Sequence, residues 1–284
     1  MGPVNTGDRP QVVAHRGASA QYAENTRAAF LHAIAEGADA VEVDVHLSAD
    51  RQLVCAHNFT VDKTSDGSGE IAEMSLNALR ALDVHSWKNP ELPEGYGSSA
   101  QQLITLPELL DIVIGADRGV DIALEMKHPS AFGHELDDAV LDLLTTRGWD
   151  PKDSSIRDTS SGEAITVTLM SFSPAALEHV LVRFPQLPPR HLCALFQRGQ
   201  MEALYLVDDG RVGVAGPSQA YVRHHRWKVR RWLRHGIELN VWTVDEPEDV
   251  RYVVEVGARR ITTNRPGAVR RLLESAEFSG AGTL

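Results

Sequence analysis

Short apolar runs alternate with helix-length amphipathic segments along most of this 284-residue chain. Eight such runs are candidate strands: residues 11–14, 40–45, 120–126, 165–171, 192–195, 211–215, 238–243 and 259–262. Helical periodicity follows several of them, at residues 26–36, 174–184, 223–235, 247–256 and 267–273. Eight β units with α connections in a chain of this length predict an α/β fold of the TIM (β/α)8 barrel type. A doubly wound parallel sheet is the alternative architecture.

Two polar stretches interrupt this alternation. Residues 58–103 carry clusters of Gly, Ser, Asp and Pro, which predict a small insertion after the second strand and its hairpin, placed to cap one end of the barrel. Residues 149–163 (WDPKDSSIRDTSSGE) are polar and rich in Ser, which predicts a surface loop. We therefore expect one domain over residues 10–275, with residues 58–103 inserted into it.

Charge and cysteine content limit the classes of protein to which the chain can belong. The formal net charge is −11, which makes nucleic acid a poor candidate for a partner because non-specific binding to it needs a basic surface. Cys55 and Cys193 lie in apolar runs, and we expect both to be buried and reduced. The first ten residues show no secretory signal, and no apolar run reaches the length of a membrane span, so we expect a cytoplasmic protein.

Three carboxylates occur where candidate strands end. Glu42 and Asp44 are two residues apart, so a strand directs both side chains to the same face. Two like charges there repel each other unless a cation lies between them. Glu125, near the end of the third strand, would add a third carboxylate. Such a set of hard oxygen ligands suits Mg²⁺ or Ca²⁺, although Glu42 taken alone is equally consistent with a structural buried charge.

Two histidines are expected beside these carboxylates. A two-residue turn at residues 49–50 would pair Glu42 with His57 across a hairpin, whereas a slip of one residue would reverse the facing. His15 and Arg16 end the first strand, and Lys127 follows the third. Two histidines of ordinary pKa can serve as general base and general acid near neutral pH. Together with a metal, an arginine and a lysine, they indicate phosphate-ester chemistry.

An ordered set of motifs in this chain resembles the glycerophosphodiester phosphodiesterase family. The likeness extends over residues 12–266, and it is the order of the motifs, more than any one of them, that is specific. The motifs are His15-Arg16-Gly17, Glu24-Asn25-Thr26, Glu42-x-Asp44, His57, Leu124-Glu125-Met126-Lys127, Ser171-Phe172 and Val241-Trp242-Thr243.

The resemblance implies a metal-dependent TIM-barrel hydrolase that cleaves glycerophosphodiesters to sn-glycerol 3-phosphate and an alcohol. It implies three groups of site residues, namely His15 and His57 as the acid/base pair, Glu42, Asp44 and Glu125 as ligands of one divalent cation, and Arg16, Lys127 and Trp242 as substrate contacts. Two other functions stay open at this point. One is a lysophospholipase D activity on lysophospholipids, and the other is a non-catalytic phosphodiester-binding protein.

The chain departs from the family pattern at three positions. Ala23 replaces a common Pro, and Asn58 and Asn264 each replace a common Asp. We expect Asn25 and Asn264 to cap the helices that follow them, so that these changes are tolerated. Asn58 follows His57, and we expect it to weaken catalysis or to alter its pH dependence.

The segment from Arg223 to Arg234 (RHHRWKVRRWLR) has six Arg or Lys residues and no acidic residue. We expect a barrel helix here, with Val222, Val229 and Leu233 facing inward and the charged side chains in solvent. The alternative is a weak contact with an anionic membrane surface. The sequence leaves the oligomeric state open.

Overall fold

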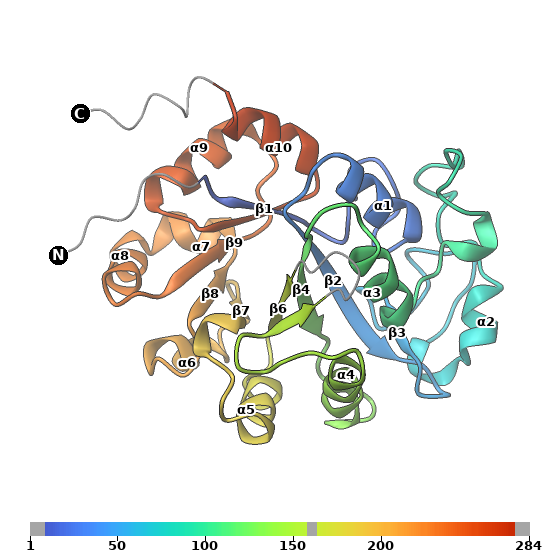
Figure 1. Cartoon of the computed structure of the whole chain (residues 1–284), viewed down its shortest axis with the longest axis horizontal. Coiled ribbons are helices and arrows are strands. Elements are labelled where there is room, and N and C mark those ends of the chain that lie inside the picture. The colour runs from blue at the N-terminus through green and yellow to red at the C-terminus, as the bar shows by residue number, and fades with distance from the viewer. Residues whose placement is uncertain (1–8, 158–163, 276–284) are drawn as a thin grey trace.

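One closed parallel sheet organises the computed structural model, which describes residues 9–157 and 164–275 (Figure 1). The strands are β1 Gln11–Ala14, β2 Ala40–Leu47, β3 Leu53–Cys55, β4 Asp121–Met126, β5 Ser155–Arg157, β6 Ala164–Ser171, β7 Leu192–Phe196, β8 Val214–Pro217, β9 Glu238–Val241 and β10 Arg260–Thr263. Eight of them pair in parallel in the order β1-β10-β9-β8-β7-β6-β4-β2, and β2 pairs again with β1. The closed barrel confirms the TIM fold and excludes the doubly wound sheet, which has open edges.

Helices surround this barrel and connect its strands (Figure 1). They are α1 Arg27–Ala35, α2 Leu76–Arg80, α3 Leu106–Ile114, α4 Glu135–Thr146, α5 Pro174–Arg183, α6 Leu204–Asp208, α7 Gln219–His224, α8 Arg226–Arg234, α9 Pro247–Val256 and α10 Pro266–Leu273. Short 3₁₀ helices lie at Ile71–Glu73, Ser99–Gln101 and Pro189–His191. Within the described part of the chain, no helix has the length and apolar character needed to cross a membrane.

Local chemistry fixes several helix starts. The hydroxyl oxygens of Thr26, Ser173 and Ser218 accept hydrogen bonds from backbone N–H groups in the first turns of α1, α5 and α7. Thr26, and not Asn25, therefore caps α1, which corrects the expectation for Asn25. Apolar side chains of these helices and of the strands form one large core, in which Phe30 and Phe196 are fully buried.

Among the barrel strands, β8 differs most from its predicted bounds. We expected a strand at residues 211–215, whereas β8 covers Val214–Pro217. Arg211 and Val212 both donate their backbone N–H groups to the carbonyl oxygen of Leu206, which closes the end of α6. These two residues therefore belong to a helix-terminating turn, and the strand begins only after Gly213.

The expectation of a surface loop at residues 149–163 is wrong for its described part. Residues 155–157 form β5, which pairs antiparallel with β6. Trp149 and Ile156 are buried, and the indole N–H of Trp149 donates to the hydroxyl of Ser154. Two large apolar side chains anchor this stretch despite its many polar residues. The rest of it, residues 158–163, lies outside the described residues.

The register of the β2–β3 hairpin also differs from the prediction. His46 pairs with Val54, one residue away from the expected register. The hairpin closes with a three-residue loop because Arg51 adopts a left-handed backbone conformation, with φ of 62°. β3 ends at Cys55, so His57 lies beyond the paired strands. The hairpin register therefore does not decide to which face of the sheet the His57 side chain points.

The segment expected as one helix over residues 223–235 is two helices. α7 ends at His224 and α8 begins at Arg226, because His225 leaves the helical region with φ of −124° and ψ of 38°. Val222 and Val229 are fully buried, as expected. Trp232 takes the third inward position in place of Leu233, which is only partly buried.

The segment 58–103 contains α2 and two of the 3₁₀ helices, and it lies beside the barrel near α1 and α3 (Figure 1). Val61, Ile71 and Leu79 form a separate small apolar cluster with Val54 of the β2–β3 hairpin. Cys55 and Cys193 are both buried free thiols, as the sequence predicted.

Gly17 provides the backbone freedom needed just after β1, and its replacement is a test of the fold. Its φ is +82°, and a Cβ atom there would lie 2.5 Å from the backbone carbon of Ala29 in α1. We expect Gly17→Ala to lower the free energy of unfolding by about 2 kcal/mol or more, from backbone strain together with the clash. Urea denaturation measures this loss.

Gly148 gives the matched control. Its φ is +80°, but a Cβ atom there would meet nothing within 4 Å. Gly148→Ala should therefore carry only the conformational cost, about 1 kcal/mol. If the two variants lost the same free energy of unfolding, the close approach of Ala29 to Gly17 would contribute nothing to the cost of Gly17→Ala.

Candidate active site

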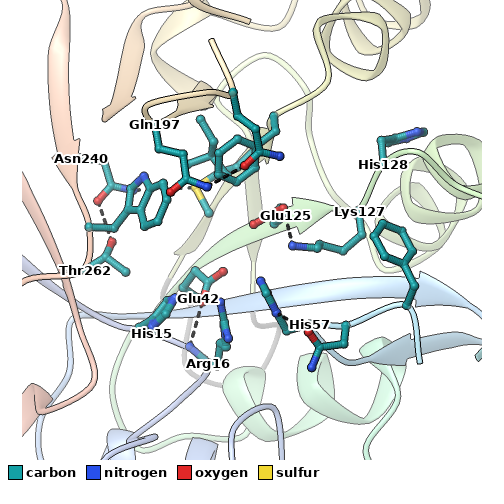
Figure 2. Close-up of a pocket in the computed structure, with 17 residues that line it drawn as sticks. His15, Arg16, Glu42, His57, Glu125, Lys127, His128, Gln197, Asn240 and Thr262 are labelled. Carbon is teal, nitrogen blue, oxygen red and sulfur yellow. Dashed lines mark hydrogen bonds and ion pairs between the residues drawn. The ribbon is translucent and has the colours of Figure 1, made fainter. Parts of the chain in front are cut away.

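A cavity of about 380 Å³ lies where the barrel strands end, and it gathers most of the predicted site residues (Figure 2). All but one of them line it: His15, Arg16, Glu42, His57, Glu125, Lys127 and Trp242. The exception, Asp44, is 1% exposed and contacts two of these side chains. The structure therefore brings together residues that are up to 227 positions apart (242 − 15) in the sequence.

The parallel barrel explains this convergence. His15 and Arg16 directly follow β1, and Trp242 directly follows β9. Glu42 on β2 and Glu125 on β4 lie on neighbouring strands, where Asp44 pairs with Glu125 in the parallel register. The carboxyl ends of parallel barrel strands meet at one face, which is where reactive groups of TIM barrels occur.

The carboxylates of Glu42, Asp44 and Glu125 form one buried cluster, in which an oxygen of each lies within 4.8 Å of the others. Burial and the charge of Asp44 raise the pKa of Glu42 well above its usual value and that of Glu125 to about 7. Burial also opposes ionisation of Asp44, but Lys127 and Arg16 outweigh it and lower the pKa of that carboxyl. Like charges that are held close together raise the pKa of some members of the group, which explains why the shifts of the three carboxyls differ in direction.

The donor chemistry of this cluster fits a divalent cation. Its ligand atoms are hard carboxylate oxygens, the type that Mg²⁺ and Ca²⁺ prefer. The Oδ1 atom of Asp44 is buried and accepts no hydrogen bond from the described residues, and its ion pair with Lys127, at 3.3 Å, leaves its second lone pair for a metal ligand bond. A bound cation would also offset the repulsion that raises the pKa values of Glu42 and Glu125.

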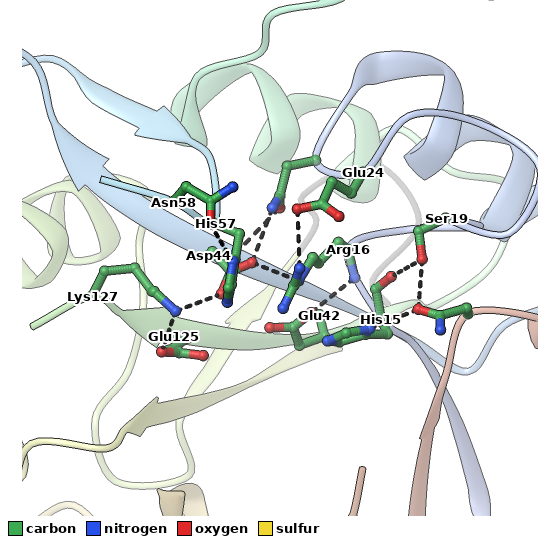
Figure 3. A network of polar contacts seen from close by, with 12 residues as sticks. His15, Arg16, Ser19, Glu24, Glu42, Asp44, His57, Asn58, Glu125 and Lys127 are labelled. Carbon is green, nitrogen blue, oxygen red and sulfur yellow. Dashed lines mark hydrogen bonds and ion pairs between the residues drawn. The ribbon is translucent and has the colours of Figure 1, made fainter. Parts of the chain in front are cut away.

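Two cationic side chains border the carboxylates (Figure 3). The Lys127 Nζ atom lies 2.8 Å from Glu125 Oε1 and 3.3 Å from Asp44 Oδ1. The Arg16 Nε atom lies 3.1 Å from Asp44 Oδ2, and its Nη1 atom lies 3.0 Å from Glu24 Oε1. The backbone N–H of Arg16 donates to Glu42 at 2.8 Å. These contacts hold positive charge at the cavity wall, where it can face an anion.

A chain of hydrogen bonds orients His15 (Figure 3). Its Nδ1 atom lies 2.7 Å from Asn264 Oδ1, and the Asn264 amide donates to Asp245 Oδ2 at 2.6 Å. Because the Asn264 oxygen is an acceptor, Nδ1 carries the proton, and Nε2 is left as an acceptor. Burial and the neighbouring Arg16 lower the pKa of His15 to about 4, so the imidazole is neutral at pH 7.

Asn264 therefore differs from our expectation of a helix cap. The N-cap position of α10 is Arg265, and the Asn264 side chain acts on His15 instead. Ser19 donates to the same Asn264 oxygen at 2.7 Å, and Asp245 also accepts from the Asn264 backbone N–H. Sequence reasoning missed this role, because a strand-end Asn before Arg-Pro looks the same whether it caps a helix or contacts a residue 249 positions away.

Replacing Asn264 with Asp tests this orientation directly. An ionised carboxylate beside Nδ1 favours the imidazolium, so we expect Asn264→Asp to raise the pKa of His15 by about one pH unit or more. The proton would then leave His15 at higher pH than in the parent protein. A titration of the imidazole nitrogens by NMR measures this. An unchanged pKa would contradict the contact.

His57 approaches the cluster from the other side of the cavity. Its Nδ1 atom lies 3.3 Å from Asn58 Oδ1, and its backbone carbonyl oxygen accepts from the Nε2 atom of buried His46 at 3.3 Å. Burial lowers the pKa of His57. His46 also contacts the ring of Phe59, with the ring centroids 5.0 Å apart. His46 is a supporting residue that sequence reasoning missed, since its place in the largely apolar run of β2 predicts only that it is buried.

Asn25 is a second supporting residue that the sequence analysis placed elsewhere. It has φ of 56°, and its amide nitrogen donates to Asp44 Oδ2 at 3.0 Å. Its amide oxygen accepts from the Asp44 backbone N–H at 3.3 Å. Asn25 therefore holds Asp44 at two points, which fixes the carboxylate next to Arg16 and Lys127.

Trp242 forms part of an apolar wall of the cavity, and its role as a substrate contact stays a prediction. Its indole N–H donates to the carbonyl oxygen of Gly216 at 2.8 Å. Its ring packs edge to face against that of Phe172, with the ring centroids 5.6 Å apart. Met170 and Leu195 extend this wall. The cavity thus has one charged side and one apolar side, which suits a ligand with both an anionic group and a carbon skeleton.

The fold and this arrangement define a TIM-barrel enzyme whose reactive groups lie at the carboxyl ends of its strands. A model of the "Glycerophosphoryl diester phosphodiesterase family" matches residues 15–268. The chain is 36% identical over 276 residues to a probable glycerophosphodiester phosphodiesterase 1 of Mycobacterium tuberculosis, covering 95% of each chain. It is 26% identical to a glycerophosphodiester phosphodiesterase of Caldanaerobacter subterraneus, covering 92% of this chain and 97% of that one. The chain belongs to the glycerophosphodiester phosphodiesterase family.

Solved structures share the fold. A phosphodiesterase of Oleispira antarctica, solved in complex with the product sn-glycerol-3-phosphate, superposes with a TM-score of 0.76 at 23% identity, covering 94% of this chain and 98% of that one. A putative glycerophosphoryl diester phosphodiesterase of Silicibacter pomeroyi gives the same TM-score at 24% identity, covering 94% of each chain.

Proposed function

We propose that this enzyme hydrolyses glycerophosphodiesters to sn-glycerol 3-phosphate and an alcohol, with one divalent cation, Mg²⁺ or Ca²⁺, at Glu42, Asp44 and Glu125. The observation that carries the proposal is that His15 and His57 line one cavity together with the carboxylate cluster. The product bound by the Oleispira antarctica protein of the same fold also supports it.

The two histidines perform the proton transfers in this proposal. One imidazole takes the proton of the glycerol 2-hydroxyl as that oxygen attacks phosphorus, and the other gives a proton to the oxygen of the leaving alcohol. Water then opens the resulting cyclic phosphate with the two roles exchanged. The Asn264 contact to His15 Nδ1 supports such a role, because it leaves Nε2 to exchange the proton.

The cations and the aromatic wall hold the substrate. Arg16 and Lys127 line the cavity, and in this proposal they offset the charge on the phosphoryl oxygens, which is greatest in the transition state. When bound, the divalent cation adds Lewis-acid stabilisation of the same oxygens. Trp242 and Phe172 provide an apolar surface for the glycerol carbons.

A coupled assay of glycerol 3-phosphate release tests the function. Glycerophosphocholine, glycerophosphoethanolamine, glycerophosphoglycerol and a lysophospholipid are compared, each with and without EDTA. We expect release from the glycerophosphodiesters that EDTA abolishes and that added Mg²⁺ or Ca²⁺ restores. For the lysophospholipid, release of the headgroup alcohol is measured instead, because cleavage of its headgroup ester leaves lysophosphatidic acid and no glycerol 3-phosphate. Headgroup release from this substrate alone would support the lysophospholipase D alternative. Binding of metal and substrate without turnover would support a non-catalytic phosphodiester-binding protein.

We also infer that residues 10–275 form a single domain with residues 58–103 as an insertion. The single sheet that contains the strands of the described chain supports this, and so does the small apolar cluster that joins the inserted segment to the β2–β3 hairpin.

A further inference from the structure

Helix α8 presents an arginine-rich face with an exposed tryptophan at its centre. Its inner side packs on the barrel through the buried residues Val229 and Trp232. Trp227 lies on the opposite side and is 70% exposed. At 100° per residue, four arginines surround Trp227 on that outer arc, namely Arg226, Arg230, Arg231 and Arg234. We call these five residues the α8 face.

No ion pair joins an arginine of the α8 face to a carboxylate among the described residues, whereas neighbouring basic residues form such pairs. Arg223 of α7 forms an ion pair with Asp249, and Lys228 of α8 pairs with Asp208 at 2.8 Å. The guanidinium carbon of Arg226 lies over the ring of Tyr252, 5.6 Å from its centroid. Arg231 lies close enough to Asp208 to help lower the pKa of that carboxyl, but Asp208 is already paired with Lys228, so most of the positive charge of the α8 face is left in excess, in a protein whose net charge is −11. Such a local patch attracts a large anion and turns this side toward it.

We propose that the α8 face binds the surface of an anionic phospholipid membrane, with Trp227 at the level of the headgroups. Tryptophan concentrates at the membrane interface because its ring is apolar and its N–H is polar. Arginines around it pair with lipid phosphates, and an amphipathic helix with this pattern lies flat on a bilayer. α8 is at the outer edge of the barrel, on the side opposite α2, so a flat surface can approach it (Figure 1).

Such docking has a consequence that rests on the proposed function. Glycerophosphodiesters are phospholipids without their acyl chains, so the reaction that supplies them is the hydrolysis of both acyl esters at a membrane. An enzyme bound to that surface meets its substrate where it is released. The docking itself does not depend on this consequence and is tested separately.

Co-sedimentation of the full chain with vesicles tests the docking. Vesicles of phosphatidylcholine with 30% phosphatidylglycerol are compared with vesicles of phosphatidylcholine alone. We expect the protein to bind the anionic vesicles, to bind the neutral ones at least tenfold more weakly, and to be released from the anionic ones at 0.5 M salt, because screening weakens the attraction. The double variant Arg230→Glu/Arg231→Glu should lose the binding. The wavelength of maximum tryptophan emission should change when the protein binds the anionic vesicles, and Trp227→Phe should remove most of that change.

A matched control keeps the change of charge and moves it elsewhere. Lys152 precedes β5 and Arg157 is its last residue; both are exposed, and Lys152→Glu/Arg157→Glu alters the net charge as much as the α8 variant does. This control should bind vesicles far better than the α8 variant. Glycerol 3-phosphate release from soluble substrate, measured on both, reports on the proposed function separately. Equal binding by the two variants would overturn the proposal. So would a lack of binding of the parent protein to the anionic vesicles.

Discussion

We expect His57→Ala to lower kcat for glycerophosphodiester hydrolysis by about 10² to 10⁴-fold, the usual contribution of a positioned general acid or base. The reason is geometric. His57 lies beyond the end of β3, and it lines the cavity together with the carboxylate cluster and His15. His15→Ala should have a loss of similar size. Since both imidazoles act in one reaction, the double variant should be little worse than either single variant. Steady-state kinetics with glycerol 3-phosphate release measures these effects.

The control for this prediction is His224→Ala. His224 is exposed at the end of α7 and does not line the cavity, so kcat should stay within about twofold of the parent value. Circular dichroism and thermal unfolding establish that each variant is folded. If folded His57→Ala hydrolysed the substrate at more than a tenth of the parent rate, the two-histidine mechanism would be wrong.

The barrel itself was predictable because its strands are buried on both faces. β2 is buried at all eight positions, and a strand of this kind appears in the sequence as a nearly continuous apolar run. Glu42 and Asp44 interrupt that run, and their placement could be explained only by a partner or a cation. The same physics that defines the strand therefore made its two carboxylates conspicuous.

The hairpin register could not be predicted in the same way. Its loop has three residues because Arg51 takes a left-handed conformation, which Gly, Asn or Asp adopt far more readily. No local pattern marks an arginine for that role. His57 nevertheless lines the cavity, because β3 is short and His57 lies beyond the paired strands in either register, while its catalytic role stays a prediction.

The supporting residues of the site were missed for a different reason. Asn264 contacts His15, and Asn25 contacts Asp44, through side chains that the closed barrel brings together. Hydrophobic periodicity contains no information about such polar pairs. The nearest signal was the resemblance, in which Asn264 replaces a common Asp, and the structure gives this position a role beside a histidine rather than at a helix end.

Mg²⁺ or Ca²⁺ should bind more tightly as the pH rises from 6 to 8. The pKa of Glu125 is raised to about 7, so this carboxyl holds a proton in the metal-free protein below that pH, and the pKa of Glu42 is raised in the same direction by burial and the charge of Asp44. A cation binds the ionised form, so it must displace those protons, and each one displaced strengthens apparent binding about tenfold per pH unit below the pKa. Isothermal titration calorimetry in two buffers of different ionisation enthalpy measures both the affinity and the protons released.

The same carboxyls set the pH dependence of stability. The pKa of Glu125 is raised in the folded state from an ordinary 4.5 to about 7, so its contribution to stability is fully present below pH 4.5 and is lost as the pH rises through 7. The Tm of the metal-free protein should therefore carry a falling component between pH 5 and 8. Saturating Mg²⁺ or Ca²⁺ should reverse it, because the bound cation favours the ionised carboxylates.

Glu125→Gln separates this explanation from a general effect of charge. The amide keeps the size of the side chain but removes one ionisable ligand, so we expect metal affinity to fall by about 10 to 100-fold and its pH dependence to become shallower. Glu202→Gln, at an exposed position outside the cluster, makes the same change of charge and should leave both unchanged. Full hydrolytic activity after exhaustive chelation, with no effect of Mg²⁺ or Ca²⁺ on Tm, would refute the metal site. The three carboxylates would then have to be stabilised by Arg16 and Lys127 alone, with Glu42 and Glu125 kept protonated.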